Sequence, residues 1–169
     1  MKQQEKLRQI VYTGVFAALI CMLTMLHIPV GNGYIHLGDS LIYVAACMLP
    51  MPYGVIAAAI GGGMSDIMSG YAIYALPTLI IKSLLSLTFY GLGAQKPATL
   101  YNKRSGGASV LCVLITVVGY AITGRILYGS NAAAIETIPG NLMQGIGSAI
   151  LFFVFAMALS RVKRPIIRR

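Results

Sequence analysis

Charged residues are scarce in this sequence, and acidic residues are the scarcest of them. Only 10% of the 169 residues are charged, and Asp and Glu together number 4. A soluble domain carries roughly 25% charged residues, whereas this chain is 57% hydrophobic and has a mean hydropathy of +0.79. The composition therefore excludes an ordinary soluble domain and predicts one membrane-embedded domain over residues 1–169.

The motifs of several enzyme and metal-binding classes are also absent. Cys21, Cys47 and Cys112 lie in apolar segments without CxxC spacing, so neither a disulfide framework nor a zinc site is indicated. The chain contains no GxxxxGK[ST], HExxH or GxSxG sequence, which argues against P-loop ATP hydrolysis, metal-dependent hydrolysis and serine hydrolysis. We therefore expect no enzymatic activity, no catalytic residues, no cofactor and no bound metal.

Apolar segments recur six times along the chain. A membrane-spanning helix needs about 20 mostly apolar residues. The predicted helices cover about 9–29, 39–51, 53–69, 73–93, 108–129 and 137–160. The second and third are short and separated by Pro50 and Pro52, which predicts a tight hairpin between them. The predicted fold class is an all-α integral membrane protein with six transmembrane helices.

Basic residues gather on one side of this predicted topology. Six spans place both termini and the loop at 94–107 on the same side, and three basic clusters fall there. These clusters comprise Lys2, Lys6 and Arg8; Lys96, Lys103 and Arg104; and Arg161, Lys163, Arg164, Arg168 and Arg169. Lys and Arg are enriched in cytoplasmic loops. The N and C termini are therefore predicted to be cytoplasmic, in a multi-pass protein of the cell membrane.

The remaining polar side chains concentrate in the outer half of the predicted bundle. Lys82 lies nine residues into its helix, about 13 Å deep at 1.5 Å per residue. The others lie nearer the outer ends of their helices or in the preceding loop: His36, Asp39, Asp66, Arg125, Glu136, Asn141 and Gln144. Ionisable groups inside a bilayer are costly and indicate function by default. Because the inner halves are almost entirely apolar or small, this depth favours a pocket open to the outside over a continuous pore.

Several of these residues also have purely structural interpretations. Asp39 would cap its helix by accepting backbone N–H bonds. Asp66 would form an ion pair with Lys82. Asn141 and Gln144, which lie on one helix face, would hydrogen-bond a neighbouring helix. The sequence leaves these alternatives open beside a role in binding.

The same holds for the residues expected nearest the membrane surface. His36 would be an interfacial loop residue, Arg125 would extend to the outer head groups, and Glu136 would be a solvated first-turn acid. Tyr34 and Tyr74 fit the interfacial enrichment of tyrosine, yet a planar ring substrate would also stack on such faces.

Small residues in the first predicted helix indicate close helix contact. Gly14 and Ala18 form a small-xxx-small pair near the cytoplasmic end, with Ala17 beside it. Small residues let helix backbones approach closely in membranes. The pair therefore serves either internal packing or docking of another membrane subunit.

Three segments together resemble a known family. They are "GNGYIHLGDSLIYVAACMLP", "AAAIGGGMSDIMSGYAIYALPTLIIKSLL" and "ETIPGNLMQGIGSAI". In this order they resemble the substrate-binding S components of energy-coupling factor (ECF) transporters. The resemblance runs from the first helix to the sixth. It is greatest to the branch with riboflavin-like, pyridoxine, hydroxymethylpyrimidine and queuosine-precursor carriers.

The resemblance implies a six-helix protein that binds one vitamin-like molecule in its outer half. Its first helix would dock on a membrane coupling subunit driven by two cytoplasmic ATPase subunits, and Gly14-xxx-Ala18 stands where that family usually has AxxxA. The loop with Tyr34, His36 and Asp39 would close the pocket. The residues we expect to contact substrate are Tyr34, His36, Asp39, Asp66, Tyr74, Lys82, Arg125, Glu136, Asn141 and Gln144.

The favoured substrate is a small planar nitrogen heterocycle, with a queuosine precursor such as queuine placed first. A carboxylate suits the ring N–H and amine donors of such a molecule. Pyridoxine, hydroxymethylpyrimidine and riboflavin are the alternatives. Two other classes of protein stay open at this stage, a non-transporting membrane assembly subunit and a solitary secondary permease.

Overall fold

Helices make up most of the residues that the structure describes. The computed structural model describes residues 2–30, 33–93 and 102–161. Six α-helices cover Lys2–Met25 (α1), Asp39–Met48 (α2), Tyr53–Met68 (α3), Ala75–Leu92 (α4), Lys103–Tyr128 (α5) and Asn131–Ser160 (α6). A short hairpin of β1 (Ile28–Val30) and β2 (Gly33–Ile35) links α1 to α2, and the 3₁₀ helix η1 (Ala72–Tyr74) precedes α4. The predicted six-helix class is confirmed.

The helix boundaries differ from the predicted ones where polar residues continue an apolar helix. α1 begins at Lys2 rather than near residue 9, and α5 begins at Lys103 rather than near residue 108. The Asn102 side chain accepts a hydrogen bond from the Ser105 N–H and so caps α5. Hydropathy marks only the part of a helix that crosses the apolar layer, so the polar extensions were not predicted.

The outer connections also differ from the sequence prediction. α1 ends at Met25, and Ile28 pairs with Ile35 across the antiparallel hairpin, which was not predicted. α6 begins at Asn131, six residues before the predicted start, because the Ser130 side chain caps it by accepting from the Ala132 N–H. Gly129 ends α5 in the left-handed conformation with φ 64°, which glycine adopts without steric cost.

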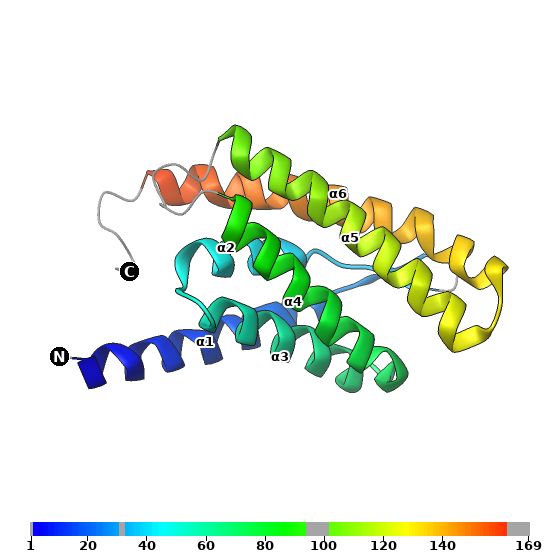
Figure 1. Cartoon of the computed structure of the whole chain (residues 1–169), viewed down its shortest axis with the longest axis horizontal. Coiled ribbons are helices and arrows are strands. Elements are labelled where there is room, and N and C mark those ends of the chain that lie inside the picture. The colour runs from blue at the N-terminus through cyan, green and yellow to red at the C-terminus, as the bar shows by residue number, and fades with distance from the viewer. Residues whose placement is uncertain (1, 31–32, 94–101, 162–169) are drawn as a thin grey trace.

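The short helix α2 forms the centre of the bundle. It contacts α1, α3, α4 and α6, while α1 packs on α3, α3 on α4, α4 on α5 and α5 on α6. Figure 1 shows α5 and α6 side by side along one edge of the molecule and α1 and α3 along the opposite edge, with α4 between them. Nine of the ten residues of α2 are buried. Polar groups on α2 are therefore held inside the protein.

The outer surface of the bundle is apolar. Large hydrophobic side chains such as Leu7, Val15, Leu76, Val118 and Ile150 are exposed. Four helices are long and apolar enough to cross a membrane, whereas α2 and α3 are shorter apolar helices of 10 and 16 residues. Because lipid replaces water around such a surface, these exposed side chains stabilise insertion.

Candidate functional site

A buried ion pair lies at the start of the central helix. The Lys82 Nζ of α4 is 2.6 Å from the Asp39 Oδ1 of α2, and the two side chains are 1% and 0% exposed. Asp39 is the first residue of α2, the N-cap is Gly38, and the Asp39 carboxylate accepts from Lys82 and Gln144. The interpretation of Asp39 as only a helix cap is therefore not borne out. The sequence analysis considered Asp66 as the partner of Lys82, whereas the structure pairs Lys82 with Asp39, because α2 lies in the centre of the bundle beside α4.

Gln144 joins this pair from the last helix. Its Nε2 donates to the Asp39 Oδ2 at 3.1 Å, and the residue is 3% exposed. Asn141, one turn earlier on α6, instead donates to the Thr137 carbonyl of its own helix. Of these two amides, only Gln144 reaches the ion pair. We call Asp39, Lys82 and Gln144 the polar triad.

Two residues that the sequence analysis missed lie beside the triad. The Lys82 Nζ is 5.5 Å from the centroid of the Tyr120 ring, within range of a cation–π interaction. The Tyr120 hydroxyl is in turn 2.9 Å from the Thr78 Oγ1. Thr78 precedes Lys82 by one turn on α4 and so shares its face. The spacing of four residues in the sequence could therefore have identified Thr78. Nothing in the apolar sequence of α5 distinguishes Tyr120, which only the packing of α5 on α4 brings here.

The glycine run of α3 makes room for Lys82. A Cβ atom at Gly62 would lie 2.7 Å from the Lys82 Cγ and 3.2 Å from the Thr78 Cγ2. Both distances are shorter than ordinary van der Waals contact. Glycine at this position therefore lets the Lys82 stem pass between α3 and α4 toward Asp39.

The loop before α2 is folded inward against the triad. His36 is 4% exposed rather than interfacial, and its Nδ1 accepts a hydrogen bond from the Gly38 N–H at 3.1 Å. Burial and the nearby Lys82 ammonium lower the pKa of His36 to about 3, so the imidazole is neutral at physiological pH. A Cβ at Gly38 would collide with the Thr24 hydroxyl. The Tyr34 side chain lies outside the described residues.

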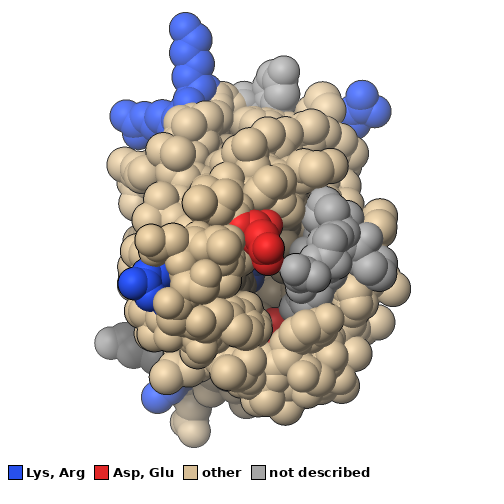
Figure 2. Space-filling view, turned by 90° about the vertical axis from the view of Figure 1, so that its right-hand side faces the viewer, with Lys and Arg blue, Asp and Glu red and all other residues tan. Residues whose placement is uncertain are grey.

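The other predicted site residues differ in burial. Asp66 of α3 is 3% exposed. The half-buried Tyr74 donates to the Tyr128 hydroxyl at 3.3 Å. Arg125 and Glu136 are exposed. Figure 2 views the molecule from the end at which α5 is connected to α6. This face has a small hollow with acidic atoms at its edge.

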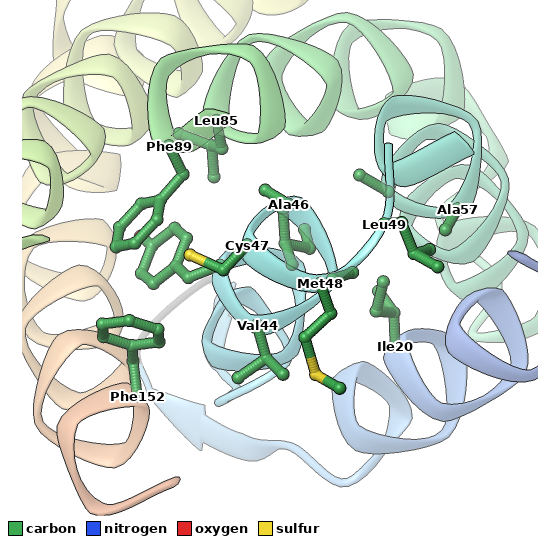
Figure 3. Packing of buried hydrophobic residues seen from close by; sticks show 14 of the residues in the cluster. Ile20, Val44, Ala46, Cys47, Met48, Leu49, Ala57, Leu85, Phe89 and Phe152 are labelled. Atoms are coloured by element: carbon green, nitrogen blue, oxygen red, sulfur yellow. The ribbon is translucent and has the colours of Figure 1, made fainter. Parts of the chain in front are cut away.

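An aromatic cluster closes the site toward the cytoplasmic side. The Tyr43 ring stacks on Phe89 with centroids 4.5 Å apart, and Phe152 meets both rings edge-on at 5.9 and 4.8 Å. Figure 3 shows Phe89 and Phe152 pointing toward one another from α4 and α6, beside the side chains of α2. The triad is therefore followed, one to two helix turns further along α2, α4 and α6, by packed aromatic rings.

The fold and this site define a multi-pass membrane protein with a buried polar site in its outer half. Residues 4–161 match the family described as "ECF-type riboflavin transporter, S component". The chain belongs to this family of ECF transporter S components and is thus a substrate-binding subunit, not an enzyme, of the cell membrane. The assembly-subunit and solitary-permease interpretations are thereby replaced.

Two individual proteins extend this comparison. A Pyrococcus woesei protein described as "Uncharacterized protein in gap 3'region" is 29% identical over 130 residues, covering 77% of this chain and 84% of that protein. The solved structure described as "Structure and mechanism of the S component of a bacterial ECF transporter" has a TM-score of 0.76 at 16% identity, covering 94% of this chain and 99% of that one. At this identity the structural similarity concerns the fold.

Proposed function

We propose that the polar triad captures a small planar nitrogen heterocycle with a guanine-like edge, a queuosine precursor such as queuine being favoured. The observation that carries this proposal is the buried Asp39 carboxylate between the Lys82 ammonium and the Gln144 amide. A carboxylate has about four lone-pair sites and accepts two parallel N–H bonds well. The ring N–H and exocyclic amine of a deazaguanine present that pair of donors, and its carbonyl oxygen suits Lys82 or Gln144.

The other predicted residues extend this proposed site toward the outside. His36 and Asp66 are buried near the triad, and Tyr74 lies at the outer end of α4 with a ring for stacking. Arg125, Glu136 and Asn141 would contact substrate only from the rim, and Tyr34 stays a predicted contact. Thr78 and Tyr120 are added to the proposed lining because they contact Lys82 or its neighbours.

Riboflavin is the second candidate substrate, because the matched family is described as a riboflavin transporter S component. Its flavin ring offers one N–H between two carbonyl groups. Asp39 would accept from that N–H, while Lys82 and Gln144 would donate to the carbonyls. Pyridoxine and hydroxymethylpyrimidine present fewer paired donors and rank lower.

The substrate is tested by mass spectrometry of small molecules released when the purified protein is denatured. We expect a deazaguanine in stoichiometric amount, and titration of added queuine should then show saturable binding to the emptied protein. The variant Gln144→Leu should bind queuine at least about tenfold more weakly than the parent protein, since a hydrogen bond to a charged group contributes about 1.5–3 kcal/mol. Release of riboflavin, or saturable binding of riboflavin but not of queuine, would refute the deazaguanine assignment.

The free face of α1 is the proposed docking site for a membrane coupling subunit that works with two cytoplasmic ATPase subunits. Gly14 and Ala18 are exposed on this face, and a Cβ at Gly14 would meet nothing within 4 Å. Ala17 is 7% exposed, and its carbonyl lies against Gly61 of α3, so it packs inside the bundle. Docking is therefore assigned to Gly14 and Ala18 rather than to all three residues.

Leucine at Gly14 and Ala18 is expected to prevent assembly with the coupling subunit, because its side chain keeps the two helix backbones apart. The measurement is co-purification of the tagged S component with its coupling and ATPase subunits. Gly107→Leu on α5 is the matched control, since Gly107 is also exposed with nothing within 4 Å of an added Cβ. Equal assembly of both variants would contradict the docking assignment.

A further inference from the structure

Besides the Tyr43 hydroxyl, three buried Ser and Thr hydroxyl groups have no hydrogen-bond partner in the part of the chain that the structure describes. Ser86, Thr116 and Ser148 are 1%, 0% and 0% exposed. None of their hydroxyl oxygens has a partner among the described residues. Buried polar groups are nearly always hydrogen-bonded, so three such groups on three different helices require an explanation.

These hydroxyls differ from three other buried Ser and Thr hydroxyls of the same bundle. Thr13 donates to the Gln9 carbonyl, and Ser109 and Thr123 donate to the carbonyls of Ser105 and Gly119. Each of those bonds returns to the residue's own helix four positions earlier, the usual arrangement for a hydroxyl on an apolar helix. Ser86, Thr116 and Ser148 make no such bond and are thus available to another group.

The helix register places the three hydroxyls in one layer beneath the polar triad. Ser86 follows Lys82 by four residues on α4, and Ser148 follows Gln144 by four on α6. Thr116 precedes Tyr120 by four on α5, which runs in the opposite direction. Residues four apart share a helix face, so each hydroxyl lies one turn further inward on the face that already contacts the triad.

The aromatic cluster bounds this layer on its inner side. Phe89 and Phe152 follow Ser86 and Ser148 by about one helix turn, and their ring centroids are 4.8 Å apart. Both rings are completely buried. The hydroxyl layer therefore lies between the charged groups of the triad and these two buried rings. Tyr43, which follows Asp39 by four residues on α2, lies at the same depth.

We propose that Ser86, Thr116 and Ser148 form a deep subsite for a hydroxyl-bearing substituent of the captured molecule. This inference rests on the proposed function, because it takes the triad as the site of the heterocyclic ring. A hydroxyl is both donor and acceptor, so it pairs with several Ser or Thr hydroxyls at once. The substrate is then a heterocycle with a hydroxylated arm, such as queuine or riboflavin, rather than a bare base.

The test compares ligands that differ in that arm. Queuine is paired with 7-aminomethyl-7-deazaguanine, which lacks the hydroxylated ring, and riboflavin with lumiflavin, which has a methyl group in place of the ribityl chain. The variant Thr116→Val/Ser148→Ala removes two hydroxyls with little change in volume. The matched control is Ser109→Ala, whose hydroxyl is buried but already bonded to its own helix. Dissociation constants are measured by calorimetry or fluorescence on the detergent-purified protein.

We expect the double variant to bind the hydroxylated member of a pair at least about tenfold more weakly, the effect of one to two buried hydrogen bonds. The member without the arm should lose less than about twofold on the same basis, and Ser109→Ala should change neither. Equal losses for both members, or none for either, would overturn the subsite and leave the hydroxyls to bound water. Selective loss with riboflavin, in a protein that binds no deazaguanine, would retain the subsite and refute the queuine assignment.

Discussion

Replacing Asp39 by alanine is expected to abolish substrate binding and to lower the free energy of unfolding by about 3–5 kcal/mol. Asp39 and Lys82 are 0% and 1% exposed and 2.6 Å apart. Removing the carboxylate leaves the Lys82 ammonium buried without its counter-ion and frees the Gln144 amide that donates to the same group. Ligand titration and reversible unfolding in detergent measure the two effects.

A second substitution separates stability from binding. Lys82→Met in the Asp39→Ala background removes the orphaned charge, and apolar replacement of a buried ion pair is often neutral or stabilising. The double variant should therefore regain most of the lost stability while still failing to bind substrate. Glu5→Gln serves as the control, since this acid is exposed on α1 and lies outside the proposed site. An Asp39→Ala protein as stable as the parent would show that the pair is not buried as described.

Alanine at Gly61 is expected to loosen the packing of α1 on α3. A Cβ at Gly61 would lie 2.7 Å from the Ala17 carbonyl oxygen and 2.8 Å from the Ile20 Cβ. Neither atom is the end of a flexible side chain, so the helices must separate. Overpacking of this kind costs about 1–3 kcal/mol, and the expected result is a lower unfolding temperature.

Gly63 supplies a matched control two residues away on the same helix. Its added Cβ would lie 3.6 Å from the nearest atom, which is ordinary contact. Gly63→Ala should therefore be neutral or stabilise the protein by up to about 1 kcal/mol through helix propensity. If Gly61→Ala and Gly63→Ala had the same unfolding temperature, close approach of α1 and α3 at Gly61 would be disproved.

The segment GYIHLGDS shows how far sequence reasoning reaches. A histidine and an aspartate beside glycines, between two apolar segments, predicted a pocket at the outer side. The structure places His36 and Asp39 in buried positions next to Lys82. The pairing of Lys82 with Asp39 was not predicted, because Asp39 and Asp66 lie at similar depth and depth alone does not choose between them.

The same limit applies to the amides and the aromatic residues. Asn141 and Gln144 share a face of α6, yet only Gln144 reaches Asp39. Tyr120 was overlooked because a tyrosine in an apolar helix has no sequence neighbour that identifies it. Its position over Lys82 depends on how α5 packs against α4.

The sequence by itself determined the membrane class, the six helices, the side on which basic residues lie and the outer depth of the polar groups. These properties follow from local composition and from the periodicity of each helix, since lipid requires every spanning segment to be apolar and internally hydrogen-bonded. Only the tertiary structure decided which groups meet. Asp39 and Gln144 are 105 residues apart, and their contact depends on the central position of α2 between α4 and α6, which no single helix encodes.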